Sequence, residues 1–395
     1  MIIAEFMQDN SVHLSCDSGM ASIITYKYPD EPIHLFYGEG HFNAIKNELT
    51  KHNIDTSRLV FHKIKPVARI IRDYEAFSSQ LAAIKEVFSF AKTNNENKIL
   101  FTYTTMFSAF ILKFFCLMNP KIKVQSVIHA ELEKIDMKEY LSNTRLNKIQ
   151  VYFYVKLFGI QNPLKLPTPS NLKYIVYGQS IKENALKMIP SLKDKLISIP
   201  HPYLWDSIQN ETNVDNKIGL GIIGRCHAFK TIPILKKLCE DLKSRSDKNF
   251  ELLFSGYIDD EQFYDYLNSL DFVYKDGLSR TRTPDEVRNK IINKMTYALF
   301  TYNLGSYKYT ASGAVMDALN FEKPIIALSN DYIKSYFDKY GNIGYLCNSY
   351  EELLEKVSSV INNFPKEEYE LQKTNLKKIK QTDSIENLAA ELGIN

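Results

Sequence analysis

The fold of this chain is decided by residues 305–328, which read GSYKYTASGAVMDALNFEKPIIAL. A polar turn at Ser312 and Gly313 precedes a run of apolar residues at helical spacing. The helix that this run predicts must end before Pro324, because proline disfavours a helical conformation at the residue that precedes it. Residues 325–328 are all apolar and predict a short buried strand. The stretch therefore predicts a loop, a helix and a strand in immediate succession.

The start of that helix is suited to bind an anion. The first backbone N–H groups of a helix have no partner within the helix, and they lie at the positive end of its dipole. Here they belong to Ser312, Gly313 and Ala314. Asp317 follows one helical turn later and can reach a neutral hydroxyl group beside the anion. The pattern predicts a phosphate at the helix start and a ribose at Asp317.

The same residues resemble a known sequence motif. The order Ser-Gly-x-x-x-Asp-Ala-Leu-x-x-x-Lys-Pro-Ile-Ile-Ala, which begins at Ser312, is similar to the sugar-nucleotide motif of GT-B glycosyltransferases. It is most similar to that of the retaining "group 1", or family 4-like, enzymes of bacterial surface polysaccharide synthesis. Those enzymes usually carry two glutamates eight positions apart, and here Asp317 stands at the second position and Tyr309 at the first. The resemblance implies an α/β chain with the GT-B fold, in which two Rossmann-like domains face a central cleft.

The resemblance also implies an activity. A sugar would pass, with retention of configuration, from a nucleotide-diphosphate sugar such as a UDP- or GDP-hexose to a hydroxyl group. The acceptor would be a glycan or a lipid-linked carrier used for capsule, O-antigen or another surface polysaccharide. Because Tyr309 replaces the usual glutamate, a non-catalytic GT-B-like subunit that binds a glycan or another glycosyltransferase is an alternative. A nucleotide-sugar epimerase of the same fold is another, for which the first half offers Glu39 and Glu131 as acid and base.

Length and composition are those of a two-domain globular protein. The chain has 395 residues, too many for one ordinary core, and 45% of them are hydrophobic. A net charge of +3 is too small to indicate nucleic acid by itself. The five cysteines are scattered without CxxC or Cys/His spacing, so we expect a reducing, cytoplasmic compartment. The first residues do not form a signal peptide, and no run reaches the ~18 apolar residues of a spanning helix.

The expected domain boundaries follow changes in composition. Residues 1–202 alternate apolar strands with amphipathic helices, which is typical of a parallel sheet with helical crossovers. Residues 203–216 are polar and acidic and form the expected linker, and a second alternation fills residues 217–370. The resemblance implies that residues 371–395 hold a terminal helix that packs back on the first domain. The strands expected in the first half are residues 22–26, 33–37, 59–62, 98–102, 123–128 and 173–177.

A loop early in the second half carries two cations. Gly219, Gly221 and Gly224 spell G-x-G-x-x-G, but the first two lie within a predicted strand, which disfavours a dinucleotide site. Arg225 offers a planar guanidinium that can donate two parallel hydrogen bonds, and Lys230 offers a compact ammonium charge. Together these groups suit a diphosphate. The resemblance implies an arginine and a lysine at this spacing on the leaving diphosphate. The alternative is two solvated surface charges.

Two further candidate ligand-binding positions follow predicted strands. His129 ends the strand at residues 123–128, and ligands in open α/β sheets bind beyond such ends. The resemblance implies that a histidine here faces the transferred sugar, whereas a capped or core histidine is the alternative. Asp276 and Gly277 follow a strand expected at residues 272–275, where the resemblance implies the nucleotide base. No Asp-x-Asp occurs, so we expect neither an obligate metal nor another cofactor.

Residues 140–172 mix cations with aromatic residues. Such a mixture on a helix suits an anionic membrane or a lipid-linked acceptor, although aromatic residues at this density also occur in cores. The segment therefore raises the possibility of a peripheral position at the inner face of the plasma membrane. The residues concerned are Arg145, Lys148, Lys156 and Lys165 with Tyr140, Leu146, Tyr152, Phe153, Tyr154 and Phe158.

Overall fold

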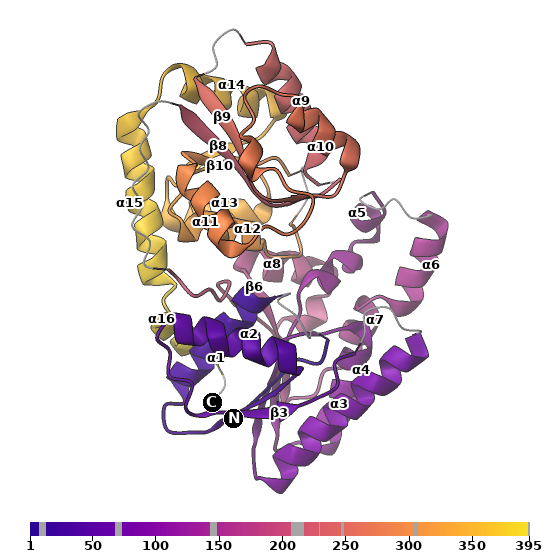
Figure 1. The fold of residues 1–395 in the computed structure, drawn as a ribbon. Helices are drawn as coiled ribbons and strands as arrows, with labels where there is room; N and C mark the ends of the chain where they lie inside the picture. Colours follow the sequence, from indigo (N-terminus) through magenta and orange to yellow (C-terminus); the bar gives the residue numbers. More distant parts are fainter. Residues whose placement is uncertain are drawn as a thin grey trace. The chain divides into compact units, whose positions relative to one another are not determined.

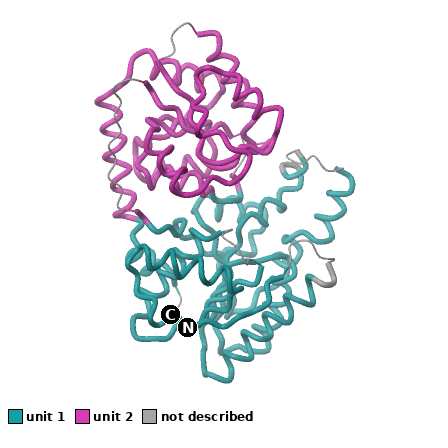
Figure 2. Tube along the Cα trace, viewed as in Figure 1, with its two compact units in different colours: residues 1–204, 309–311, 383–395 teal, residues 205–308, 312–382 magenta. Residues whose placement is uncertain are grey.

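The computed structural model describes residues 1–7, 13–67, 73–142, 148–206, 217–228, 230–245, 249–302 and 307–393. The chain forms two compact units, which Figure 2 shows in different colours. Each unit is built on its own parallel sheet flanked by helices (Figure 1). Unit 1 comprises Met1–Leu204, Tyr309–Ala311 and Asp383–Asn395, and unit 2 comprises Trp205–Lys308 and Ser312–Thr382.

The sheet of unit 1 has seven strands in the order β3-β2-β1-β4-β5-β6-β7. Every strand pairs in parallel with its neighbours, as expected for apolar strands joined by helical crossovers. Five of the six expected strands are present. The strands are β1 Ile2–Ala4, β2 Ile33–Tyr37, β3 Leu59–Lys63, β4 Lys98–Phe101, β5 Lys123–Val127, β6 Leu172–Tyr177 and β7 Leu196–Ile199.

The helices of unit 1 lie between these strands, and one comes from the end of the chain. Helix α4 begins with a capping box, in which Thr105 and Ser108 each bond the other's backbone. The helices are α1 Leu14–Lys27, α2 Glu39–Lys51, α3 Asp73–Thr93, α4 Met106–Met118, α5 Met137–Ser142, α6 Lys148–Phe158, α7 Gln161–Lys165, α8 Gln179–Met188 and α16 Ile385–Glu391, with 3-10 helices η1 Ala130–Ile135 and η2 Pro190–Leu192.

The strand expected at residues 22–26 is wrong, because these residues lie within α1. The β-branched residues from Ile23 onward favoured a strand in the sequence. Ten consecutive residues of α1 are buried, so the helix has no polar face that would reveal a helical period. The hydroxyls of Ser22 and Thr25 bond to backbone carbonyls of the preceding turn, which satisfies them inside a helix. Two strands were not among those expected: β1, which precedes α1 and pairs with β2 and β4, and β7, which pairs with β6.

Unit 2 has a five-stranded parallel sheet in the order β12-β11-β10-β8-β9. Its strands are β8 Ile218–Cys226, β9 Phe250–Ile258, β10 Tyr297–Phe300, β11 Ile325–Leu328 and β12 Gly344–Cys347. Its helices are α9 Ile232–Lys243, α10 Glu261–Asn268, α11 Asp285–Lys294, α12 Gly313–Asn320, α13 Asp331–Tyr340, α14 Tyr350–Asn362 and α15 Lys366–Thr382, with the 3-10 helix η3 Lys275–Gly277.

One expectation for unit 2 needs correction. The strand expected at residues 272–275 is reduced to one bridge, between Val273 and Leu252 of β9, because η3 begins directly after it. Helix α11 ends at Lys294, just before β10. Directly after this helix the chain joins the sheet, because the N–H of Thr296 donates to the carbonyl of Gly219 in β8.

The chain changes unit near the expected boundary. Unit 1 gives way to unit 2 between Leu204 and Trp205, and most of the expected linker, residues 207–216, lies outside the described residues. The chain returns to unit 1 at Asp383, later than residue 371, because α15 is one continuous helix that contacts α12 and α13 of unit 2. Among the described helices, none combines the length and the apolar content that crossing a bilayer would need.

The end of the chain is anchored in the core of unit 1. Helix α16 contacts α1, and its buried residues Leu388 and Ala389 belong to the same apolar cluster as Ile24. The ammonium group of Lys27 donates to the backbone carbonyls of Ala389 and Leu392 at 2.9 and 2.5 Å. Helix α16 therefore covers apolar surface of α1 that would otherwise face water.

Replacing Leu388 by alanine should destabilise the protein. Leu388 is 1% exposed, and truncating a buried leucine costs roughly 2–5 kcal/mol of unfolding free energy. Leu371 of α15 is 51% exposed, and Leu371→Ala should change the unfolding free energy by less than about 0.5 kcal/mol. Urea unfolding followed by circular dichroism measures both variants, and equal midpoints for the two would contradict the docking of α16.

Candidate functional site

The order of the strands marks one end of each sheet as a place for ligands. In unit 2 the chain runs from β8 to β9 on one side and then returns to β10 on the other. Ligands in open α/β sheets bind beyond the carboxyl ends of the strands at such a reversal. The segment after β8 carries Lys230, and the segment after β10 leads to Ser312. The topology therefore brings two of the predicted elements to one edge of the sheet.

The N-terminus of α12 is open. Ser312 is the N-cap residue, and its Oγ accepts a hydrogen bond from the N–H of Val315 at 3.4 Å. Gly313 is exposed, and a Cβ atom placed on it would have no described atom within 4 Å. The first turn of α12 therefore has room for an anion beside its backbone N–H groups.

Strand β8 runs directly against this helix. A Cβ atom placed on Gly224 would lie 3.2 Å from the Cβ of Ala314, and Gly224 has a positive φ of 86°. Both facts favour glycine at this position. On the other side, a Cβ atom placed on Gly256 of β9 would lie 1.9 Å from the carbonyl oxygen of Gly224. The end of β8 is therefore fixed between β9 and the first turn of α12.

Arg225 is held by an acidic partner that the sequence did not reveal. Its Nε and Nη2 lie 2.6 and 2.5 Å from Oδ2 of Asp259, and its guanidinium lies over the ring of Tyr257. The hydrogen bond that Arg225 donates to Asp259 raises the pKa of Arg225, so the guanidinium stays charged. The side chain is 52% exposed. Parallel pairing sets Arg225 opposite Tyr257, which brings Asp259 within reach just beyond the end of β9.

Lys230 is connected to the helix start through aromatic rings. Its Nζ lies 5.2 Å from the ring centroid of Tyr307, whose centroid lies 4.4 Å from that of Tyr302. The hydroxyl of Tyr302 lies 3.4 Å from Oγ of Ser312. The structure thus groups Arg225, Lys230, Ser312, Gly313 and Ala314 at the reversal point of unit 2.

Asp317 lies further along α12 and forms an ion pair. Its Oδ2 accepts a hydrogen bond from Nη1 of Arg288 at 2.7 Å, and Nε of Arg288 lies 3.6 Å from Asp285. Both side chains of the Arg288–Asp317 pair are largely buried, with 25% and 15% exposed. Sequence reasoning missed Arg288, because a lone arginine on an amphipathic helix gives no signal of its partner. A ribose at Asp317 would share this carboxylate with Arg288.

The remaining predicted residues of the second half have other surroundings. Tyr309 groups with unit 1 and is 2% exposed, with its hydroxyl 3.4 Å from Asp136. Asp276 lies in η3 and accepts a hydrogen bond from the hydroxyl of Tyr274 at 3.2 Å. Gly277 is buried, and a Cβ atom placed on it would lie 2.8 Å from the carbonyl oxygen of Phe254. The η3 segment therefore borders β9 of the same sheet.

Unit 1 has its own reversal point, between β1 and β4, and buried polar groups gather there. His129 donates from Nε2 to the carbonyl of Thr102 at 2.9 Å, and its ring stacks on that of His13. A carbonyl only accepts, so Nε2 carries the proton and Nδ1 the lone pair. Burial lowers the pKa of His129, which favours the neutral ring at neutral pH.

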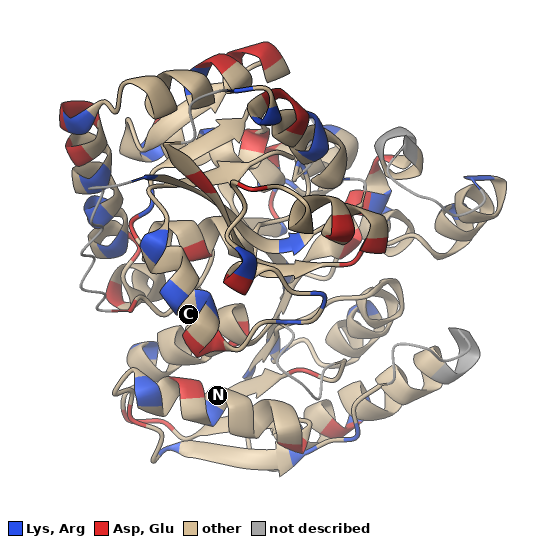
Figure 3. Ribbon diagram, turned by 45° about the horizontal axis from the view of Figure 1, so that its top comes forward, with Lys and Arg blue, Asp and Glu red and all other residues tan. Residues whose placement is uncertain are grey.

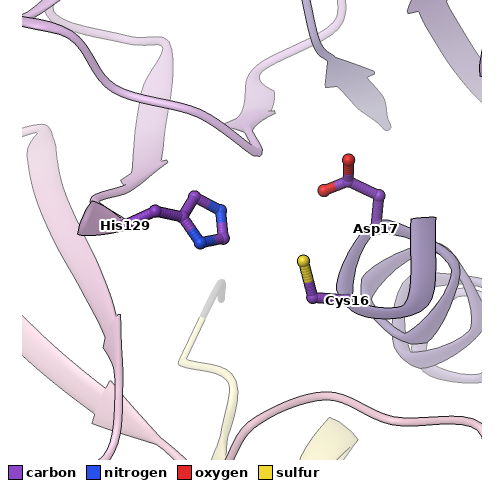
Figure 4. A group of neighbouring side chains, drawn as sticks. All are labelled: Cys16, Asp17 and His129. Atoms are coloured by element: carbon purple, nitrogen blue, oxygen red, sulfur yellow. The ribbon is translucent and has the colours of Figure 1, made fainter. Parts of the chain in front are cut away.

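Cys16, Asp17 and His129 face one another at this point (Figure 4). One possible ligand atom from each lies within 4.8 Å of the others. Oδ2 of Asp17 bonds to Nε2 of the buried His41 at 2.9 Å. Burial and the charge of Asp17 raise the pKa of Cys16 well above its usual value, and its thiol donates to the carbonyl of His13. Each of the three side chains also bonds to a residue outside the group: Cys16 to His13, Asp17 to His41 and His129 to Thr102.

Solved structures are similar to nearly the whole chain, whereas neither a family model nor a curated protein sequence matches it. The catalytic domain of starch synthase IV from Arabidopsis thaliana, bound to ADP and acarbose, has a TM-score of 0.61 at 10% identity, covering 98% of both chains. WaaG, a glycosyltransferase involved in lipopolysaccharide biosynthesis, has 0.60 at 11%, covering 99% of this chain and 98% of that chain. The chain has the GT-B fold.

The same fold includes a protein described as a UDP-N-acetylglucosamine 2-epimerase, from Listeria monocytogenes. Its TM-score is 0.51 at 12% identity, covering 96% of this chain and 95% of that chain. The GT-B expectation from residues 305–328 is thus confirmed, with two Rossmann-like units. Identities this low establish the fold and leave the chemistry to the residues of the site.

Replacing Glu5 by glutamine should change how stability depends on pH. Glu5 is fully buried after β1, and burial together with the charge of Asp17 raises its pKa from 4.5 to about 8. Between these values the unfolded chain binds fewer protons at this carboxyl than the folded chain, so the carboxyl lowers stability as pH rises. Glu5→Gln should gain thermal stability over the wild type progressively from about pH 5 to about pH 8.

Thermal unfolding at a series of pH values measures this gain. Glu86 is an exposed glutamate of α3, so Glu86→Gln is the matched control and should follow the wild type throughout. A constant difference between Glu5→Gln and the wild type across the range would show that the Glu5 carboxyl is not held protonated.

Proposed function

We propose that the chain is a glycosyltransferase that moves a sugar from a nucleotide-diphosphate sugar to a hydroxyl of a glycan or lipid-linked acceptor. One observation carries the proposal. The open first turn of α12 lies against the end of β8, so that helix N–H groups, Arg225 and Lys230 border one edge of the sheet. A diphosphate is the group that such a combination of amides and cations suits best.

The diphosphate is the part of the donor whose charge grows as the bond to the sugar breaks. Positive groups fixed in place before the reaction stabilise that charge, and this is usually the largest contribution to catalysis. Asp259 holds Nε and Nη2 of Arg225, so the Nη1 edge is the one that meets a phosphate. Lys230 supplies a point charge, and Asp317 holds the ribose beside Arg288. Asp276 and Gly277 border the nucleotide base. Tyr309 stands in place of the glutamate that would otherwise contact the sugar.

His129 is proposed to contact the donor sugar or the positive charge that develops near it. Its neutral ring with a lone pair on Nδ1 can accept a hydrogen bond from a sugar hydroxyl. Retention of configuration and a UDP- or GDP-hexose donor rest on the resemblance of the motif at Ser312, and independence from metals rests on the absence of Asp-x-Asp from the sequence. The same resemblance is our ground for proposing surface polysaccharides such as capsule or O-antigen, assembled in the cytoplasm, as the pathway; WaaG, which shares the fold, is itself described as involved in lipopolysaccharide biosynthesis.

Binding of nucleoside diphosphates tests this proposal. At a concentration of about 100 times its dissociation constant, a ligand stabilises the protein by about 2.7 kcal/mol, which a thermal-shift measurement resolves. We expect UDP or GDP to stabilise the wild type. Arg225→Ala and Lys230→Ala should each weaken binding roughly 10- to 100-fold, because a hydrogen bond to a charged group is worth about 1.5–3 kcal/mol.

Lys334→Ala is the control for the loss of a surface cation. Lys334 lies on α13, is 53% exposed and pairs with Asp338. The Lys334→Ala variant should show the same thermal shift with UDP or GDP as the wild type. If UDP or GDP stabilised the Arg225→Ala and Lys230→Ala variants as much as the wild type, the diphosphate would have to bind elsewhere.

A nucleotide-sugar epimerase is the second candidate, because one structural neighbour is described as such an enzyme. The two carboxylates expected to serve it are engaged in ion pairs, Glu39 with Lys63 at 2.6 Å and Glu131 with Lys134 at 2.6 Å. The hydrogen bond and the charge of Lys63 lower the pKa of Glu39, so less of it is protonated and available as a general acid at neutral pH.

The two candidates differ in their products. We expect a glycosyltransferase to release the free nucleoside diphosphate slowly from the donor by hydrolysis when no acceptor is present. Nuclear magnetic resonance of the nucleotide sugar distinguishes this from interconversion of two intact nucleotide sugars. Interconversion would favour the epimerase, and stable binding with neither reaction, with or without glycan acceptors, would favour a non-catalytic subunit.

A further inference from the structure

The two helices α4 and α6 of unit 1 present large apolar side chains to solvent. Sixteen large hydrophobic residues are exposed among those the structure describes, and ten of them lie between residues 110 and 166. These ten define the α4–α6 surface, and several exceed 60% exposure. They are Phe110, Phe114, Leu117, Met118, Ile149, Tyr152, Phe153, Tyr154, Leu157 and Leu166.

The exposed residues follow the helical repeat. In α4 they recur at positions 110, 114, 117 and 118, and in α6 at 149, 152, 153 and 157. Residues at such intervals share one face of a helix. Each helix therefore has an outward apolar stripe in addition to the face that packs on the unit. An apolar patch of this extent on a globular unit marks an interaction surface.

Helix α7 and an aromatic contact connect α4 and α6. The rings of Phe107 in α4 and Phe158 in α6 lie 6.3 Å apart. The ammonium group of Lys113 in α4 donates to the carbonyls of Pro163 and Leu166, each at 2.6 Å, and so binds α4 to α7. Figure 1 shows α4, α6 and α7 on the same side of unit 1. The two stripes thus belong to one connected part of the unit.

The segments that carry this surface contain no acidic residue. Residues 97–130 and 140–182 lack aspartate and glutamate altogether, whereas acidic and basic residues occur together along the ribbon of unit 2 (Figure 3). Lys156 lies over the ring of Tyr152, within the apolar stripe of α6. The cations of the two segments are Lys98, Lys113, Lys121, Lys123, Arg145, Lys148, Lys156, Lys165, Lys173 and Lys182.

We propose that the α4–α6 surface docks on an anionic lipid bilayer. Aromatic rings and leucines enter the interface between headgroups and chains, while neighbouring lysines attract anionic headgroups. A second copy of the chain fits less well, because a symmetric contact would place lysines against lysines. The proposal goes beyond glycosyl transfer, since lipid binding needs neither the nucleotide nor the sugar. It would hold the protein where a lipid-linked acceptor lies.

Sedimentation with vesicles tests the proposal on the full chain. Vesicles of phosphatidylcholine with phosphatidylglycerol should carry the wild type down, and pure phosphatidylcholine much less. Salt should weaken the binding, because exposed charges are screened over about 10 Å at 0.1 M. The double variant Lys148→Glu/Lys156→Glu should lower the partition coefficient by at least about tenfold, because each cation near an anionic surface adds to the attraction. Phe114→Ser with Leu157→Ser should lower it similarly.

Leu371→Ser is the matched control, because Leu371 is exposed on α15 outside this surface and should leave sedimentation unchanged. All substituted residues are exposed, so thermal unfolding should match the wild type, and the shift produced by nucleoside diphosphates should be retained. Wild type that stays in the supernatant with anionic vesicles would overturn the proposal. A wild-type dimer in light scattering that Phe114→Ser with Leu157→Ser dissociates would assign the surface to a second copy instead. Neither result would bear on nucleotide binding.

Discussion

The close approach of β8 to α12 is the constraint on which the site in unit 2 depends. Gly224 meets Ala314 on one side, and its carbonyl leaves no room for a side chain at Gly256 on the other. Any larger residue at Gly224 would separate the strand from the helix. The contact places the end of β8, where Arg225 lies, beside the first turn of α12, whose backbone amides at Gly313 are open. A parallel sheet with a reversal beside β8 is what makes this approach possible.

The two units use their reversal points differently. Unit 2 offers the cations Arg225 and Lys230 and open amides, which suit a multiply charged ligand. Unit 1 gathers buried titratable groups there, including Glu5, Asp17 and His129, which are costly to bury unless they bond to one another or to a ligand. The first arrangement suits binding of the charged half of a donor. The second suits orientation of uncharged hydroxyl groups, since a neutral imidazole and a protonated carboxyl such as that of Glu5 can both donate and accept.

The sequence predicted features that local patterns determine and missed those that tertiary contacts determine. The strand Ile325–Leu328 was predicted correctly, because a short apolar run between a proline and polar residues is compatible with few structures other than a buried strand. Helix α1 was mistaken for a strand because it is buried on every side. The partners of Arg225 and Asp317 come from other elements, and the register of β8 and β9 is needed to find Asp259. Composition also could not tell whether the aromatic residues of α6 lay in the core or on the surface.

The most direct test is a crystal structure of the protein with a nucleoside diphosphate. The account predicts the β-phosphate within hydrogen-bond distance of the N–H groups of Gly313 and Ala314, with Nη1 of Arg225 on the same phosphate. Asp259 should keep its contact to the other edge of the guanidinium. A diphosphate bound at another edge of the sheet, or an α12 N-terminus that stays empty beside a bound nucleotide, would contradict it.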